Sequence, residues 1–384
     1  MASTAAEAVP LRTIAVQWTR IGITGFGGPP THIALLRRLV VEQRHWIDQR
    51  EFEDALAACN LLPGPASTQL SIFLARRLGG PWGAVIGGLG FILPAVVLMI
   101  ALSAVFFGGS PPDWIRGAGA GAGAAVAAVA ARAGADLARP SLERATSRRR
   151  WIAYALLGLA AGALVGRYLV LVLLGCGRLE LGAVRGLVGR TQAWAPIALP
   201  AAVAGAGGLG AVAWVAFKVG ALSYGGGFVI VPLMQGDAVH TYHWMTSAQF
   251  LNAVALGQVT PGPVVATVAA VGYAAHGIEG AALAAAVAFA PSFAFILAGG
   301  GQFERIRTSG RAQAFLAGAG PAAVGAIFGA AIPLAAALRE TWQFVVLGAA
   351  AIALLLARRG IVVTLLSAGA VGVVAALAGA PVPR

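Results

Sequence analysis

One block of sequence occurs twice in this chain, at a constant offset of 198 residues and without a gap. The first copy runs from Gly22 to Pro65 and the second from Gly220 to Pro263. Each copy holds a Gly-Gly pair, a His-Trp pair, a phenylalanine and a Pro-Gly-Pro triplet at equivalent places. A duplication of this length predicts two equivalent halves related by a pseudo-twofold axis.

Composition predicts the environment in which these halves fold. Hydrophobic residues make up 59% of the chain and charged residues only 11%, and the mean hydropathy is +0.82. That leaves too few polar side chains to coat a soluble globule. Apolar runs such as 82–107 and 361–380 reach the roughly 18–20 residues that span a bilayer as a helix. We therefore expect an all-α polytopic membrane protein with about ten transmembrane helices, some of them broken by Gly and Pro.

The net charge of +13 does not indicate nucleic-acid binding. Arginine gathers in short links, as the positive-inside rule expects of cytoplasmic loops, and no basic stripe is interleaved with aromatic residues. The link at 139–150 carries five arginines, whereas its counterpart in the second half, Arg339-Glu340, is neutral. The second half is therefore expected to lie upside down, as an inverted repeat. We place the first repeat at 11–178, a linker at 179–195 and the second repeat at 196–380.

Each repeat contains two predicted helix breaks. Gly27-Gly28 and Gly225-Gly226 cannot sustain an α-helix, and the triplets Pro63–Pro65 and Pro261–Pro263 break a helix again. Unwound backbone at membrane depth is tolerated where it is buried in protein or lines a polar cavity. A helix that resumes after such a break presents free N–H groups and the positive end of its dipole to an oxyanion. The alternative is that the prolines only curve the helices.

A single cation precedes each Gly-Gly pair by seven residues: Arg20 in the first repeat and Lys218, the only lysine of the chain, in the second. A cation in an apolar stretch is costly in hydrocarbon, so this aligned pair indicates an anion site. The alternative is that both side chains snorkel to the membrane interface. The predicted substrate-binding residues are Arg20, Lys218, Gly27, Gly28, Gly225, Gly226, Asn60, Pro63, Gly64, Pro65, Gln69, Gln258, Thr260, Pro261, Gly262 and Pro263.

Three residues near the breaks of the first repeat are candidates for proton coupling. His32 follows the first Gly-Gly pair, and Glu53 and Asp54 lie in the helix that leads to Pro63. A lone histidine is more often a packed or hydrogen-bonded residue than a functional one. Both interpretations of His32 therefore stay open.

Enzyme and metal motifs are not found in the sequence. No zinc-protease, serine-hydrolase or Walker A signature is present, and Cys59 and Cys176 have neither metal-ligand nor disulfide spacing. The string Gly205-x-Gly207-x-x-Gly210 lies in an apolar segment without a βαβ pattern, so it does not indicate a dinucleotide site. We expect no enzymatic activity, no cofactor and no bound metal.

The doubled pattern resembles the chromate transporter family over nearly the whole chain. The resemblance is carried by Gly25-Phe26-Gly27-Gly28-Pro29, His32, Trp46, Phe52, Pro63-Gly64-Pro65 and Gln69, and by Lys218, Tyr224, Gly225–Gly227, Pro232, Trp244, Phe250 and Pro261-Gly262-Pro263. It implies a bacterial inner-membrane protein that exports chromate, driven by the proton motive force, with sulfate as a related substrate. Asn60 departs from the family pattern, which has a glutamine there, as this chain has at Gln258.

We therefore expect a multi-pass secondary transporter, a proton-coupled antiporter, that moves a tetrahedral divalent oxyanion through a site between the halves and gives chromate resistance. Its expected partners are chromate or sulfate, protons and the lipid bilayer, and a homodimer stays open. One alternative is an importer or exchanger of sulfate or another oxyanion. The other is a membrane scaffold or lipid-handling protein that transports nothing.

Overall fold

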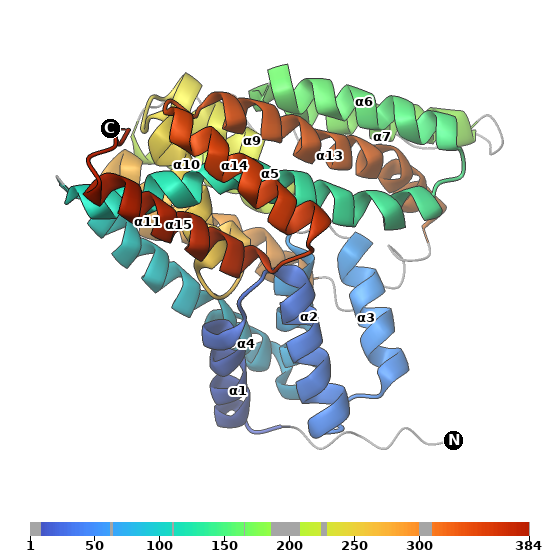
Figure 1. The fold of residues 1–384 in the computed structure, drawn as a ribbon. Helices are drawn as coiled ribbons and strands as arrows, with labels where there is room; N and C mark the ends of the chain where they lie inside the picture. The colour runs from blue at the N-terminus through green and yellow to red at the C-terminus, as the bar shows by residue number, and fades with distance from the viewer. Residues whose placement is uncertain are drawn as a thin grey trace, which may run out of the picture.

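A computed structural model describes residues 9–61, 64–109, 111–164, 166–185, 208–223, 229–298 and 309–383. Within these ranges the chain forms α-helices joined by turns and by short 3-10 and π-helical segments, and no strand (Figure 1). The all-α fold expected from the sequence is confirmed.

The first repeat begins with three short helices and continues with a long one. Its helices are α1 (Leu11–Thr24), α2 (Pro29–Arg37), α3 (Gln49–Leu61), α4 (Ala66–Phe107), α5 (Asp113–Glu143), α6 (Arg148–Leu164) and α7 (Leu169–Arg185). A π-helical segment, η1 (Arg38–Gln43), follows α2, and a 3-10 turn, η2 (Gly166–Tyr168), precedes α7.

The second repeat follows the same order. Its helices are α8 (Leu209–Leu222), α9 (Ile230–Gln235), α10 (Ser247–Val259), α11 (Thr267–Ala298), α13 (Gly310–Ala336), α14 (Thr341–Ala351) and α15 (Ile361–Leu377). Between them lie the π-helical segments η4 (Gly236–Thr241) and η6 (Ile352–Leu356) and the 3-10 turn η5 (Val264–Ala266).

The duplicated sequence folds in the same way twice. The segments η1 and η4 occupy equivalent positions, separated by the 198 residues of the sequence repeat. The histidine after each segment, His45 or His243, has a left-handed backbone with φ of 50° or 53°. The next amide, of Trp46 or Trp244, donates to the carbonyl six residues earlier over 2.9 or 2.8 Å. The His-Trp pair therefore closes the same turn in both repeats.

Each repeat also holds one long helix that folds back on itself. The backbone of α4 is non-helical at Gly79–Gly80, and that of α11 is non-helical at His276–Gly277. Gly80 and Gly277 have positive φ of 65° and 58°, a conformation that a residue without Cβ adopts without strain. The two arms pack so closely that a Cβ on Gly272 would collide with the carbonyl of Gly280. Both long helices are thus helical hairpins.

The helices that follow the hairpins in one half pack against helices of the other half. Helix α5 of the first half packs against α14 and α15, and α13 of the second half packs against α6 and α7 (Figure 1). Gly158 and Gly162 on α6 lie against Ala322 and Ala326 on α13, because small residues let helices in lipid approach closely. One large apolar core runs through both halves. The repeat boundaries placed at 11–178 and 196–380 stay a prediction.

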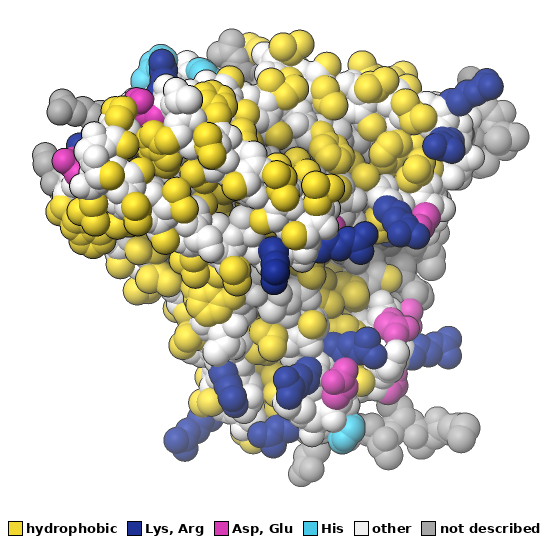
Figure 2. Space-filling view, viewed as in Figure 1, with side chains coloured by type: hydrophobic (Ala, Val, Ile, Leu, Met, Phe, Trp, Pro, Cys, Tyr) yellow, Lys and Arg dark blue, Asp and Glu magenta, His cyan; other side chains and the backbone are white. Residues whose placement is uncertain are grey.

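In the described ranges, four helical stretches are long and apolar enough to cross a membrane: Ala66–Phe107, Asp113–Glu143, Val264–Ala298 and Gly310–Ala336. Shorter apolar helices lie at 209–222, 341–356 and 361–377. Large apolar side chains cover much of the surface in Figure 2, and Val97 and Leu356, for example, are 63% and 78% exposed. An apolar exterior of this extent suits lipid. The polytopic membrane class is confirmed, and the number of about ten crossings stays a prediction.

Candidate functional site

The first helix break expected from the sequence lies between α1 and α2. Helix α1 ends at Thr24 and α2 begins at Pro29. Gly27 and Gly28 join them with positive φ of 104° and 76°, a backbone region that favours glycine. The equivalent pair at 225–226 lies outside the described residues.

The start of α2 does not offer the free amides that the sequence predicts. Its first two residues, Pro29 and Pro30, have no N–H group. The amides of Thr31 and His32 both donate to the Gly28 carbonyl, over 3.1 and 3.2 Å. This part of the prediction was wrong, because two prolines at the start of a helix remove the donors that an anion would use.

The Pro-Gly-Pro breaks are also present in the structure. Helix α10 ends at Val259 and η5 begins at Val264, and Gly262 lies between them with φ of 97°. In the first repeat Gly64 has φ of 121°, and Pro65 directly precedes α4. Pro63 lies outside the described residues.

The Pro-Gly-Pro break of each repeat lies against the first helix of the other repeat. A Cβ built on Gly262 would lie 3.5 Å from the carbonyl oxygen of Gly22, and one built on Gly64 would lie 3.5 Å from that of Gly220. Gly22 is equivalent to Gly220 and Gly64 to Gly262, so the two contacts are equivalent as well. Reciprocal contacts of this kind are those of a twofold axis, which here passes between the breaks.

The carbonyl of Gly25, directly after α1, accepts hydrogen bonds from α2 and from the Pro-Gly-Pro break of the second repeat. It accepts a hydrogen bond from the Gly262 amide over 3.0 Å and a second one from Nε2 of His32 over 2.9 Å. A carbonyl only accepts, so Nε2 of His32 carries the proton. The His32 ring is fully buried and meets Phe91 edge-on, with 5.0 Å between the ring centroids. The hydrogen bond from His32 thus holds the Gly25 carbonyl in place. A role of His32 in proton coupling stays a prediction.

Buried polar side chains follow Gly64 and Pro65 at the start of α4. Ser67, Thr68 and Gln69 are at most 2% exposed, and the side-chain amide of Gln69 lies against Gly64. No side chain caps α4, and the Thr68 hydroxyl has no hydrogen-bond partner among the described residues. A buried helix start with an unused hydroxyl group suits an anion.

The second repeat contributes one comparable amide. Gln258 is 6% exposed, and its side-chain nitrogen has no hydrogen-bond partner within the described part of the chain. Thr260 is different, because its hydroxyl donates to the Leu256 carbonyl over 2.7 Å. Asn60, which aligns with Gln258, is exposed at the end of α3. The two aligned amides thus lie in different surroundings.

Lys218 is partly buried on α8 and paired with an acid. Its Nζ lies 2.5 Å from Oδ2 of Asp237 on η4, with the two side chains 14% and 5% exposed. The ammonium also lies 5.5 Å from the ring centroid of Trp214. Sequence reasoning missed Asp237, because its equivalent in the first repeat is Leu39. A signal was available, since Asp237 is the only charged residue between positions 229 and 239.

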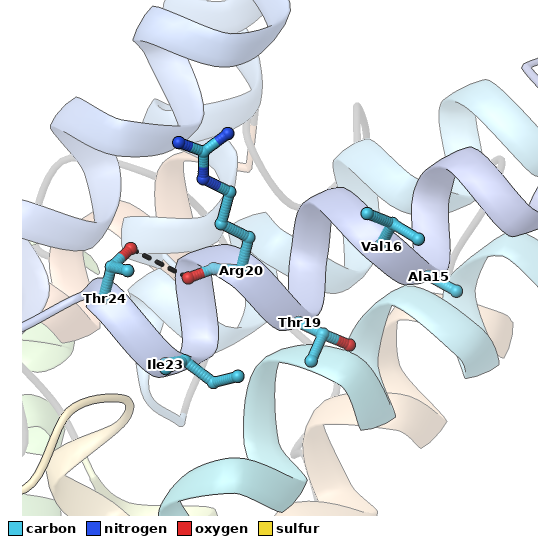
Figure 3. Close-up of a pocket in the computed structure, with 6 residues that line it drawn as sticks. All are labelled: Ala15, Val16, Thr19, Arg20, Ile23 and Thr24. Carbon is cyan, nitrogen blue, oxygen red and sulfur yellow. Dashed lines mark hydrogen bonds between the residues drawn. The ribbon is translucent and has the colours of Figure 1, made fainter.

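Arg20 has different surroundings from Lys218. It is exposed on α1 beside an open, largely apolar groove of about 450 Å³, lined by Ala15, Val16, Thr19, Arg20, Ile23 and Thr24 (Figure 3). Its backbone carbonyl accepts a hydrogen bond from the Thr24 hydroxyl over 2.8 Å, and its guanidinium makes no ion pair with another described residue. The structure brings Lys218, but not Arg20, to an acidic partner. A binding role for Arg20 stays a prediction.

The two acidic candidates for proton coupling lie on the exposed side of α3. Both Glu53 and Asp54 are exposed, and Glu53 accepts a hydrogen bond from Gln49 over 2.7 Å. Among the described residues, no group of three or more His, Cys, Asp or Glu side chains is arranged to hold a metal ion. The chemical groups of this site are a partly buried cation, backbone breaks and neutral donors.

The doubled architecture has a counterpart among known sequences. Residues 12–181 and 210–373 both match the model of the family described as chromate transporter. The chain belongs to the chromate transporter family. The family model thus matches each half of the structure separately.

Named relatives agree with the family match. The chain is 33% identical over 349 residues to the chromate transport protein of Cupriavidus metallidurans, covering 85% of this chain and 82% of the relative. It is 33% identical over 383 residues to the chromate transport protein of Pseudomonas aeruginosa, covering 93% and 90%. It is 30% identical to a probable chromate transport protein of Synechococcus elongatus, covering 85% of both. No solved structure matches the chain.

Proposed function

We propose that this chromate transporter family protein is a secondary transporter that exports chromate across the bacterial inner membrane, driven by the proton motive force, and so gives chromate resistance. The proposal is supported by relatives named chromate transport proteins, which align along most of their length. The partly buried cation Lys218 is the observation that carries it, because a charged side chain placed within an apolar helix of a membrane protein is costly and marks the path of a charged substrate.

The neutral donors around the breaks complete the proposed site. Gln69 at the start of α4 lies against Gly64, and Gly64 faces the Gly220 carbonyl of α8, the helix that also carries Lys218 on another of its sides. A tetrahedral oxyanion has four oxygens that accept hydrogen bonds, so amides, hydroxyl groups and a helix start suit it together with one cation. Gln258 is the donor expected from the second repeat.

The membrane potential favours the proposed direction. Moving one charge through about 100 mV is worth about 2.3 kcal/mol, so a divalent anion leaving a negatively charged interior gains about 4.6 kcal/mol. A proton that enters in exchange adds about 2.3 kcal/mol more, because it moves one further charge in the same electrical sense. Antiport with protons can therefore export chromate against a large concentration gradient.

Chromate flux in liposomes containing the purified protein tests the proposal. We expect uptake of chromate into vesicles whose interior is made positive, at a rate that saturates with concentration. Unlabelled sulfate is expected to compete, since the two oxyanions share charge and geometry. Vesicles without protein provide the control. Flux no faster than in those vesicles would contradict the proposed function and favour a non-transporting membrane protein.

A further inference from the structure

We propose that Asp237 is a built-in counter-anion that competes with the transported oxyanion for Lys218. The inference rests on the proposed function and concerns how the same site is controlled. In the empty protein the carboxylate of Asp237 would hold the place of the oxyanion, and the oxyanion would bind Lys218 by displacing it.

The contact between the two residues leaves little room for a simultaneous ligand. Oδ2 of Asp237 lies 2.5 Å from Nζ of Lys218, and the side chains are 5% and 14% exposed. The ring of Trp214 lies near the same ammonium, at 5.5 Å. An oxyanion that makes this short contact with the ammonium therefore has to take over the position of the carboxylate. The two anions exclude each other there, because unpaired negative charges at close range repel.

Comparison of the two repeats indicates that the fold does not require this acid. The first repeat builds the same π-helical turn, η1, with the buried Leu39 at the position of Asp237. The amide of Arg44 donates to the Leu39 carbonyl over 3.0 Å, and the equivalent amide of Tyr242 donates to the Asp237 carbonyl over 2.8 Å. The backbone is thus indifferent to the side chain. The acid is present only in the repeat whose cation is partly buried.

The competition gives the transport cycle a neutral empty state. A buried ammonium that has lost its oxyanion would be left uncompensated, which hinders movement through a low-dielectric interior. Once Asp237 pairs with Lys218 again, the empty protein returns without carrying a buried charge. Removal of the carboxylate is therefore expected to strengthen oxyanion binding and to slow the return of the empty protein.

The variant Asp237→Asn tests this inference by two measurements on the full chain. Sulfate binding, followed by calorimetry in detergent, is expected to be at least about tenfold tighter than in the wild type, because the tethered competitor is gone. In liposomes, exchange of chromate for sulfate is expected to persist while net chromate flux falls. Asp136→Asn is the matched control, because Asp136 is half exposed in a surface pair with Arg132. It is expected to match the wild type in both measurements.

Lys218 offers an independent measurement, because it is the only lysine in the chain. An amine-specific reagent therefore labels Lys218 and the α-amino group alone, and mass spectrometry separates the two. Asp237→Asn is expected to label faster at Lys218 than the wild type, and saturating sulfate is expected to slow this labelling. If Asp237→Asn does not fold, Asp237→Leu, which copies the first repeat, replaces it.

Two results would overturn the inference. One is sulfate affinity in the Asp237 variants that is unchanged or weaker while the wild type still transports, which would leave the pair a purely structural contact. The other is Lys218 labelling that sulfate does not affect in any variant. A failure of the proposed function differs from both, because the wild type itself would then neither bind nor move an oxyanion.

Discussion

The Gly262 amide of the second repeat donates a hydrogen bond to the Gly25 carbonyl of the first, over 3.0 Å. This bond joins two interrupted helices that lie more than two hundred residues apart in the sequence. Carbonyl groups freed by a break at membrane depth have to be satisfied inside the protein. Here the second repeat satisfies one such carbonyl of the first.

Close packing at the axis makes Gly220 intolerant of a side chain. A Cβ there would collide with the carbonyl of Ala288 on α11. We expect Gly220→Ala to lower the free energy of unfolding by about 1–3 kcal/mol, because α8 and α11 have to move apart to admit the methyl group. Thermal unfolding in detergent measures the effect. Gly348→Ala is the control, since a Cβ at Gly348 meets open space. Equal stability of the two variants would contradict the packing at the axis.

His32 is expected to act by positioning the Gly25 carbonyl. Replacement His32→Leu removes the donor and is expected to cost about 1–3 kcal/mol of stability, because a buried carbonyl loses one of its two partners. His32→Gln keeps an N–H donor and is expected to restore both stability and chromate flux. The flux is measured with and without an imposed pH gradient. A glutamine variant that transports but no longer responds to that gradient would instead assign His32 to proton coupling.

Gln258 is expected to bind the oxyanion through its unused amide nitrogen. Gln258→Leu removes this donor and is expected to weaken chromate binding by about tenfold, because a hydrogen bond to a charged group contributes about 1.5–3 kcal/mol. Gln258→Asn keeps an amide and is expected to retain most of the affinity. The concentration dependence of flux measures both. Equal affinity in the leucine variant and the wild type would place this amide outside the site.

Arg20 and Lys218 are expected to differ in their contribution to flux. Lys218 is largely buried and paired, whereas Arg20 is exposed beside an apolar groove, where a cation can reach the membrane interface. Arg20→Ala is therefore expected to reduce chromate flux by less than about threefold, and Lys218→Ala to abolish it. Flux in liposomes with equal amounts of inserted protein checks this. Loss of flux in both variants would assign both cations to the site, as the sequence alone predicts.

The sequence alone predicted the all-α membrane class, the duplication and the positions of the helix breaks. Glycine and proline act locally, so Gly27-Gly28 and the second Pro-Gly-Pro triplet end helices where the pattern indicated. The burial of the two cations was not predictable in this way. Arg20 and Lys218 occupy equivalent positions, and their different surroundings depend on which helices pack around α1 and α8.

Two features of the site required the three-dimensional arrangement. Asp237 has no equivalent acid in the first repeat, so a search for matched residues passed over it. Helices α5 and α13 each pack against helices of the opposite half. These contacts join residues far apart in the sequence, and hydropathy does not reveal them. The start of α2 was a different case, because Pro29 and Pro30 already show in the sequence that donors are missing there.

Chromate flux driven by an imposed membrane potential tests the central claim, namely that Lys218 forms the charge of an oxyanion pathway. The measurement compares the wild type with the double variant Lys218→Met/Asp237→Asn, which removes the cation without leaving a buried carboxylate unpaired. The wild type is expected to show saturable flux that follows the potential, and the folded double variant to show none. Equal flux in the two proteins, or none in the wild type, would contradict the account.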